Sequence, residues 1–198
     1  MDDLNPLYEN TLKILILGDS SVGKSNFIFR YIKNEYNGKH FTSTGAELKN
    51  TEVIVGSNKF RLQIWDTAGQ KKFEDITKTL FPKVQGFIVM FDITKKESYN
   101  GAKYWIKSIK EENGKNSPIL LIGNKNDLED TRLISIEEIT KYANEENLNY
   151  IETSSKTGNN IHKSISIICQ LIFDNKESSN SFSLNLSSHT KKRKKMCC

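Results

Sequence analysis

The sequence predicts an α/β fold with a mostly parallel sheet, and three observations carry this prediction. Three short runs are almost uninterruptedly apolar, as in strands covered on both faces, at residues 12–17, 87–91 and 119–122. Residues 97–112 and 135–146 have the periodicity of amphipathic helices, and residues 161–173 form a more apolar one. Because strands and helices alternate, we expect the ligand site at the carboxyl ends of the strands.

One further strand is predicted to be antiparallel. Residues 60–65 alternate between apolar and polar side chains, and they follow residues 51–55 across Gly56, Ser57 and Asn58. This pattern is typical of a hairpin, so we expect one antiparallel strand at an edge of the sheet.

Length and composition indicate one cytosolic globular domain. The chain has 198 residues, of which 36% are hydrophobic and 27% charged, values that are ordinary for such a domain. Residues 1–10 are acidic and polar, unlike a signal peptide. Of the three cysteines, Cys169 lies in an apolar run and is predicted to be a buried thiol, so no disulfide framework is expected.

Composition also divides the chain. We expect an N-terminal extension at residues 1–10, the main domain at residues 11–174 and a flexible tail at residues 175–198. The first part of this tail, residues 175–190, is rich in serine and asparagine and predicts a linker.

The first apolar strand is followed by a phosphate-loop motif, G-x-x-x-x-G-K-[ST]. Glycines at both ends let the backbone fold around phosphate with its N–H groups pointing inward. Lys24 is predicted to neutralise the β- and γ-phosphates, and the Ser25 hydroxyl to ligate Mg²⁺. The residues expected to contact nucleotide here are Gly18, Asp19, Ser20, Ser21, Val22, Gly23, Lys24, Ser25 and Asn26.

A second motif ends the alternating strand. Asp66 is predicted to hold Mg²⁺, and Gly69 to bring a backbone N–H close to the γ-phosphate. Gln70 is then placed to orient the attacking water and is the predicted catalytic residue.

Two further stretches follow later strands and predict recognition of guanine. A carboxylate at Asp127 can accept hydrogen bonds from a pair of N–H donors that guanine has and adenine lacks. This difference predicts strong discrimination in favour of guanine. The residues expected to form this part of the pocket are Asn124, Lys125, Asp127, Ser154, Ser155 and Lys156.

These four motifs, in this order, resemble the Ras superfamily of small GTPases, and most closely its Rab family. The resemblance covers residues 11–174 and implies a P-loop small-GTPase fold with a six-stranded sheet, five flanking helices and two nucleotide-sensing switch loops. It also implies that Tyr36 packs against the guanine ring and that the Ser155 backbone N–H reads its carbonyl.

The resemblance implies partners as well: GTP or GDP with Mg²⁺, an exchange factor, a GTPase-activating protein, effectors, a GDP-dissociation inhibitor and a prenylation escort. It implies a monomer that binds no nucleic acid. The effector surface is expected to comprise His40, Phe41, Thr42, Ser43, Thr44, Gly45, Ala46, Glu47, Leu48 and Trp65.

Several positions depart from the family pattern. Ser43 stands where the first switch normally presents a threonine to Mg²⁺ and GTP, and the adjacent Thr44 is an alternative ligand. Leu48 replaces the effector-loop phenylalanine, and Lys71 and Lys72 follow Gln70 where Rab proteins carry Glu-Arg. The nucleotide chemistry survives these changes, whereas the partner surface is expected to diverge.

The tail is predicted to be a membrane anchor. The net charge is +5, and residues 191–195 supply five cations, so the remainder of the chain is neutral overall. Such a run attracts anionic lipid, although alone it is also typical of nuclear-localisation or nucleic-acid segments. The terminal Cys197 and Cys198 resemble the double geranylgeranylation signal of Rab proteins, which favours a prenyl anchor.

The sequence thus predicts a Rab-like GTP/GDP switch that hydrolyses GTP and regulates vesicle traffic at the cytoplasmic face of membranes, with a cytosolic pool. One alternative is a GTP-binding membrane scaffold with little hydrolysis. Another is a P-loop kinase of small molecules, which the guanine-reading stretches disfavour.

Overall fold

The computed structural model describes residues 11–36, 38 and 45–190. A six-stranded sheet has the order β2-β3-β1-β4-β5-β6, in which the β2–β3 pair is antiparallel and the other pairs are parallel. The strands are β1 (Thr11–Leu17), β2 (Glu47–Val55), β3 (Asn58–Asp66), β4 (Gly86–Asp92), β5 (Ile119–Asn124) and β6 (Asn149–Thr153).

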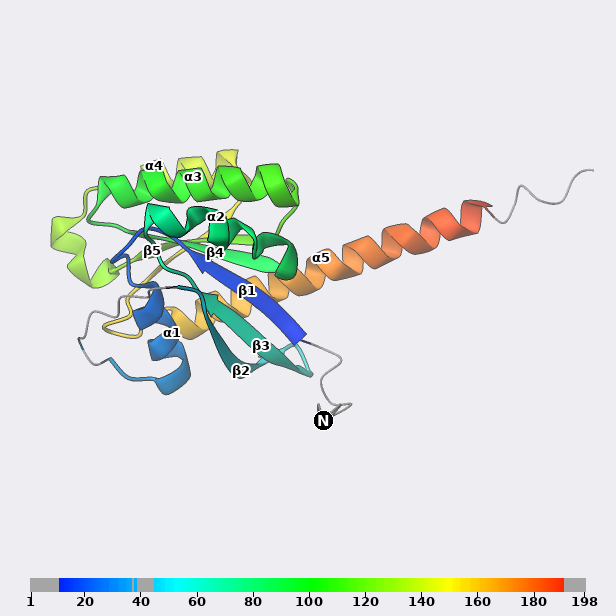
Figure 1. Cartoon of the computed structure of the whole chain (residues 1–198), viewed down its shortest axis with the longest axis horizontal. Coiled ribbons are helices and arrows are strands. Elements are labelled where there is room, and N and C mark those ends of the chain that lie inside the picture. The colour runs from blue at the N-terminus through cyan, green and yellow to red at the C-terminus, as the bar shows by residue number, and fades with distance from the viewer. Residues whose placement is uncertain (1–10, 37, 39–44, 191–198) are drawn as a thin grey trace, which may run out of the picture.

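Helices cover both faces of the sheet (Figure 1). The α-helices of the described residues are α1 (Lys24–Lys33), α2 (Glu74–Lys78), α3 (Lys96–Asn113), α4 (Ile136–Glu145) and α5 (Ile161–Thr190). Short 3-10 helices lie at η2 (Lys71–Phe73), η3 (Phe81–Lys83) and η4 (Asn126–Thr131). The predicted sheet, its antiparallel edge and the five flanking helices are therefore confirmed.

Alternation along β1 explains why the sheet is covered on both faces. Leu12, Ile14 and Ile16 pack in one core with α1 and α5, whereas Leu15 and Leu17 pack in the other with α3 and α4. Successive side chains of a strand point to opposite faces, so a fully apolar run requires apolar layers on both sides. Cys169 is buried in the first core, as its apolar run predicts.

The predicted hairpin closes in a two-residue turn. Val55 pairs with Asn58, which leaves Gly56 and Ser57 in the turn, and Gly56 has a φ of 60°. Glycine suits this left-handed conformation because it has no Cβ.

The C-terminal helix differs from the prediction. The linker expected at residues 175–190 is helical, because α5 runs without a break to Thr190 and projects from the body of the molecule (Figure 1). Composition indicated an irregular segment, but residues 161–190 contain neither glycine nor proline, the residues that most readily end a helix. Across the described residues, none of the helices is both long and apolar enough to cross a membrane.

Candidate functional site

The turn between β1 and α1 has the backbone that the phosphate-loop motif predicts. Gly18 and Gly23 have φ values of 139° and 104°, and Ser21 has a φ of 66°. A Cβ at Gly18 would collide with the Met90 carbonyl, and one at Gly23 with Nδ2 of Asn124. Both glycines are therefore required by conformation and by close approach.

Lys24 is held at the base of this loop. Its Nζ donates to the carbonyl oxygens of Gly18 and Asp19, at 2.8 and 2.9 Å, and the side chain is almost entirely buried. Burial lowers the pKa of Lys24 to about 8, although the charges of Asp66 and Asp19 raise it in part. The buried Lys24 ammonium, bound only to backbone carbonyl oxygens in the hydrogen bonds described here, favours binding of an anion at this loop.

Strand β3 delivers the second motif beside the loop. Asp66 ends β3 opposite Ile16 and is buried, and the Thr67 hydroxyl donates to the Ile16 carbonyl at 2.6 Å. A Cβ on Gly69 would lie 2.5 Å from the Ser20 nitrogen, so the backbone here rests directly on the phosphate loop. Gln70 follows in extended conformation immediately before η2.

Asn124 joins the loop to the far strands. Its Nδ2 donates to the Val22 carbonyl at 2.8 Å, and its Oδ1 accepts from the Thr153 hydroxyl at 3.0 Å. The residue is 1% exposed, so its amide is satisfied by the protein itself. Asn124 therefore links the phosphate loop, through Val22, to the end of β6, through Thr153.

The segments after β5 and β6 meet at Asp127. The Ser154 hydroxyl donates to Asp127 Oδ1 at 2.5 Å, and Lys156 Nζ lies 3.9 Å from Asp127 Oδ2. Ser154 also accepts from the Thr157 backbone nitrogen at 3.1 Å, which fixes the loop that carries it. The carboxylate is thus oriented by residues of another strand end.

Lys125 takes the left-handed conformation, with a φ of 68°, and forms an ion pair of 2.6 Å with Asp92. Asp92 ends β4, is fully buried and accepts from the Thr94 nitrogen and hydroxyl. Burial raises the pKa of Asp92, but the hydrogen bonds from Lys125 and Thr94 outweigh it, and the pKa lies below its usual value. No sequence motif singles out Asp92, which lies at the end of an apolar run.

These segments surround one cavity of about 270 Å³. Of the predicted nucleotide-binding residues, those that line it are Ser20, Ser21, Gly23, Lys24, Ser25, Asn26, Tyr36, Gly69, Asn124, Lys125, Asp127, Ser155 and Lys156. Gly18, Asp19, Val22, Asp66 and Ser154 are not among the residues that line it. Thr67 and Leu128 also line it, and the motifs did not single them out.

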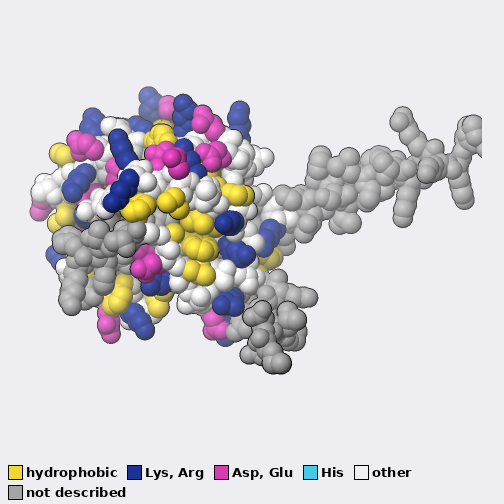
Figure 2. Space-filling view, viewed as in Figure 1, with side chains coloured by type: hydrophobic (Ala, Val, Ile, Leu, Met, Phe, Trp, Pro, Cys, Tyr) yellow, Lys and Arg dark blue, Asp and Glu magenta, His cyan; other side chains and the backbone are white. Residues whose placement is uncertain are grey.

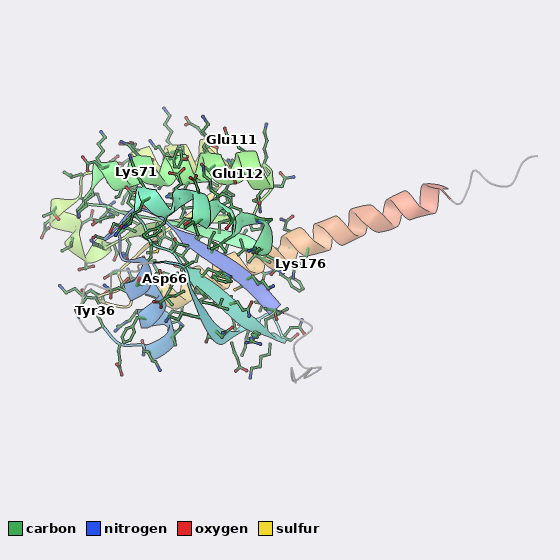
Figure 3. All side chains as sticks on the ribbon, in the orientation of Figure 1. Tyr36, Asp66, Lys71, Glu111, Glu112 and Lys176 are labelled. Carbon is green, nitrogen blue, oxygen red and sulfur yellow. The ribbon has the colours of Figure 1, made fainter. Side chains whose placement is uncertain are left out.

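The cavity has one end at the phosphate loop and the other at Asp127. Tyr36 lies on the side of the body away from Lys176 of α5, and Asp66 lies between the two, nearer the middle of the body (Figure 3). The cavity lies where the parallel strands terminate, since β1, β3 and β5 end at or just before residues that line it, as expected for a ligand site in an open α/β sheet.

Comparison with known proteins supports the family resemblance that the sequence motifs indicate. The Ras family model matches residues 13–174. The GTP-binding protein ypt3 of Schizosaccharomyces pombe is 36% identical, over 84% of this chain and 78% of the relative. The chain belongs to the Ras family.

Other relatives place this Ras-family chain among the Rab proteins. The Ras-related protein Rab-3 of Caenorhabditis elegans is 36% identical, over 82% of this chain and 76% of the relative. The Ras-related protein Rab-27B of Homo sapiens is 34% identical, over 86% of this chain and 83% of the relative. The predicted family and fold are confirmed, and the chain is a Rab-type GTPase, a GTP-hydrolysing switch of vesicle traffic.

The effector surface of this Rab-type GTPase is described only in part. His40, Phe41, Thr42, Ser43 and Thr44 lie outside the described residues, as do the basic run and Cys197 and Cys198. Ala46, Glu47 and Leu48 are exposed, and Leu48 pairs in register with the half-buried Trp65.

Hydrophobic side chains gather on the face that Figure 2 shows, over the region of β1, β3 and α2. Leu80 and Phe81 do not join Leu48 and Trp65 at this surface. Both Leu80 and Phe81 are instead buried, because η3 packs them into the core with α3.

Proposed function

We propose that the cavity binds GTP and GDP with Mg²⁺ and that the bound nucleotide sets the conformation of the two switch loops, residues 36–47 and 69–81. The observation that carries this proposal is the meeting of the phosphate loop with Asn124, Asp127 and Ser155 around one cavity. A site for phosphate alone needs only the loop, whereas these additional residues make a second, polar end suited to a base.

At the phosphate end, the loop and Lys24 receive the β- and γ-phosphates. Backbone N–H groups at the start of α1 favour an anion, and Lys24 exchanges its carbonyl partners for phosphate oxygens. Gly69 supplies a further N–H to the γ-phosphate, because the absence of a side chain lets its backbone approach the loop.

At the base end, Asp127 accepts from the paired N–H groups of guanine, and the Ser155 N–H donates to its carbonyl. Ser154 and Lys156 hold the Asp127 carboxylate in place. Tyr36, which is exposed and lines the cavity, packs against the ring. Adenine would leave Asp127 without donors, and a mismatch of this kind gives strong discrimination.

The donors at the phosphate end fit Mg²⁺. Ser25 lines the cavity, and the buried Asp66 is near enough to influence the pKa of Lys24. Hydroxyl and carboxylate oxygens are ligands for this cation, with phosphate and water supplying the rest. Ser25 and Asp66 are the assigned protein ligands, with Ser43, or Thr44 in its place, from the first switch. When bound, Mg²⁺ neutralises charge on the phosphate oxygens.

Gln70 orients the water that attacks the γ-phosphate. It follows Gly69, which lines the cavity, and ordering of the second switch brings its amide to the water. No arginine occurs among the described residues that line the cavity. Intrinsic hydrolysis is therefore slow, and an activating protein accelerates it.

The test of this role compares the wild type with Gln70→Leu. Both proteins are loaded with fluorescent mant-GTP, and phosphate release is followed in a single turnover, with and without activating proteins. We expect unchanged nucleotide binding and hydrolysis slowed about tenfold or more in the variant. Equal hydrolysis in both would contradict the assignment. Little hydrolysis by the wild type under every condition would favour the membrane scaffold instead.

The Rab-type assignment also supports an effector surface, at residues 40–48 and Trp65, and a cycle that involves an exchange factor, an activating protein, a GDP-dissociation inhibitor and a prenylation escort. We propose that prenyl groups on Cys197 and Cys198, together with the basic run, hold the protein on the cytoplasmic face of membranes, with a soluble pool in the cytosol. Two chains at about 0.8 kcal/mol per buried CH₂ anchor a protein stably, and each nearby cation adds roughly 1 kcal/mol.

The anchor is tested by the Cys197→Ser/Cys198→Ser double variant. Fractionation of cells should find the wild type mainly with membranes and the double variant in the soluble fraction. Both proteins should bind mant-GDP equally, which controls for folding. Persistent membrane binding by the double variant would argue against prenylation as the anchor.

A further inference from the structure

Helix α3 contains a glycine, Gly101, at the point where it passes the phosphate loop. Glycine is unfavourable inside a helix relative to alanine, so its presence calls for a local reason. A Cβ at this position would lie 2.7 Å from both Cγ and Oδ2 of Asp19, and nearer still to Oδ1. The Asp19 carboxylate therefore rests directly on the helix backbone at Gly101.

The backbone of Asp19 cannot move away to make room. Its carbonyl accepts from Lys24 Nζ at 2.9 Å, and a Cβ on Gly69 would lie 2.6 Å from the same oxygen. Asp19 is thus enclosed by the loop lysine, the start of the second switch and α3. We therefore expect rotation of the Asp19 side chain to relieve a clash at position 101.

The direction of that rotation matters for the cavity. Ser20 and Ser21 line the cavity, whereas Asp19 does not, since its carboxylate faces α3. Burial raises the pKa of Asp19, while the nearby charges of Lys24 and Lys71 lower it. Because the Lys24 charge acts on Asp19, we expect a carboxylate displaced from α3 to turn toward Lys24 and the proposed phosphate position, where like charges repel.

We propose that Gly101 is a positioning residue for the phosphate site: by lacking a side chain, it seats the Asp19 carboxylate against α3 and outside the cavity. The inference rests on the nucleotide binding proposed above and deepens it, because it names a determinant of triphosphate affinity that no motif contains.

The test introduces Gly101→Ala into three backgrounds: wild type, Asp19→Ala and Asp19→Asn. Dissociation constants for mant-GDP and a non-hydrolysable mant-GTP analogue are measured for each protein, together with the melting temperature. The effect of Gly101→Ala is always taken relative to its own background. Asn100→Ala, at an exposed neighbouring position of α3, is the matched control.

In the wild-type background, Gly101→Ala should weaken binding of the triphosphate analogue about tenfold, weaken mant-GDP binding less, and lower the melting temperature. In the Asp19→Ala background it should leave affinity unchanged and raise the melting temperature by about 2–4 °C, because alanine then only improves the helix. In the Asp19→Asn background Gly101→Ala should still lower the melting temperature, because the clash is steric. The selective loss of affinity for the triphosphate analogue should disappear, because the side chain at position 19 is then uncharged.

The outcomes separate this inference from the proposed function. If wild-type protein binds neither mant-nucleotide, the proposed function itself is wrong. If the wild type binds both and Gly101→Ala has the same effect with and without the Asp19 carboxylate, only the role of Gly101 is overturned. An Asn100→Ala variant that loses triphosphate affinity as strongly as Gly101→Ala would also overturn it.

Discussion

At the scale of single residues, the site depends on a few side chains whose partners lie far away in the sequence. Asp92 shows this most clearly, because it is fully buried at the end of β4 and holds Lys125, which lines the nucleotide cavity. A buried carboxylate is tolerated only when it is paired and hydrogen-bonded, and Lys125 and Thr94 supply those partners. The end of the cavity proposed to bind guanine is therefore supported by the charge of Asp92, which does not line the cavity.

Removing one partner of Asp92 should destabilise the protein in a pH-dependent way. We expect Thr94→Val to lower the free energy of unfolding by about 2 kcal/mol at pH 7, because a hydrogen bond to a buried charged group is lost. The folded-state pKa of Asp92 is lowered, so its contribution is present above the ordinary value of 3.8 and fades as the pH falls through and below it. The deficit should accordingly persist down to a pH of 3.8 and narrow as the pH falls further below that value.

Urea unfolding of the GDP-loaded protein at several pH values measures this deficit. Thr140→Val, at an exposed position of α4, is the control and should show no comparable loss. A deficit of the same size at every pH would mean that the Thr94 hydroxyl does not act through the Asp92 charge.

At the scale of secondary-structure elements, α1 links the two ends of the cavity. The helix begins at the phosphate loop with Lys24, and near its other end Arg30 Nη2 donates to the Thr157 carbonyl at 3.0 Å. Gly158, with a φ of 87°, lies so close that a Cβ there would be 2.6 Å from Arg30 Nη2. The helix at the proposed phosphate site thereby also positions the loop proposed to contact guanine.

Arg30→Met should loosen this connection. We expect dissociation of mant-GDP to become about tenfold faster, since loss of a charged hydrogen bond costs about 1.5 kcal/mol and the guanine loop loses its support. Displacement of mant-GDP by excess GDP measures the rate. Lys33→Met, at an exposed position of the same helix, is the control and should leave it unchanged. An unaltered rate for Arg30→Met would show that the loop holds its position without α1.

A second connection joins α2, within the second switch, to α3. Tyr104 on α3 donates to Glu74 and accepts from Lys78 at 3.1 Å, and Lys78 also lies 3.7 Å from Glu112. Ion pairs at exposed positions contribute little to stability individually, but a network of several across two helices favours one position of α2. The second switch is thus held against α3 in this conformation.

At the scale of the whole molecule, α5 belongs to both the domain and the tail. Its first half closes one core, with Ile161, Ile165, Ile168 and Ile172 buried against the sheet and α1. Beyond that half the helix extends away from the body (Figure 1). The helix therefore continues past the 174 boundary that composition predicted for the domain.

Two truncations locate the end of the folding unit. A chain that stops after Lys176 should keep its affinity for mant-GDP and a melting temperature within a few degrees of the full chain, because the core residues of α5 remain. A chain that stops after Ser164 loses Ile165, Ile168 and Ile172 and should not fold, since each buried isoleucine contributes roughly 2–5 kcal/mol. If the chain that stops after Lys176 did not fold, residues 177–198 would belong to the cooperative folding unit.

The sequence by itself determined the α/β class and placed five of the strands, and it predicted the residues proposed to contact nucleotide. These features follow from local rules: two-sided apolar runs, an alternating hairpin, and glycines that permit left-handed backbone next to a strand end. Such signals are contiguous in the chain, so they can be read before the chain folds. Tyr36, the sheet count and the effector surface came from the family resemblance, not from those rules.

Only the tertiary structure decided which side chains support the site. The Asn124 amide on Val22, Asp92 beneath Lys125, Arg30 on Thr157 and the Asp19 carboxylate on Gly101 all join residues distant in the sequence. Their positions depend on strand order and on how α1 and α3 cross the sheet, and no local pattern encodes either. The helical course of α5 likewise overrode composition, because a helix without glycine or proline is not stopped by polar residues alone.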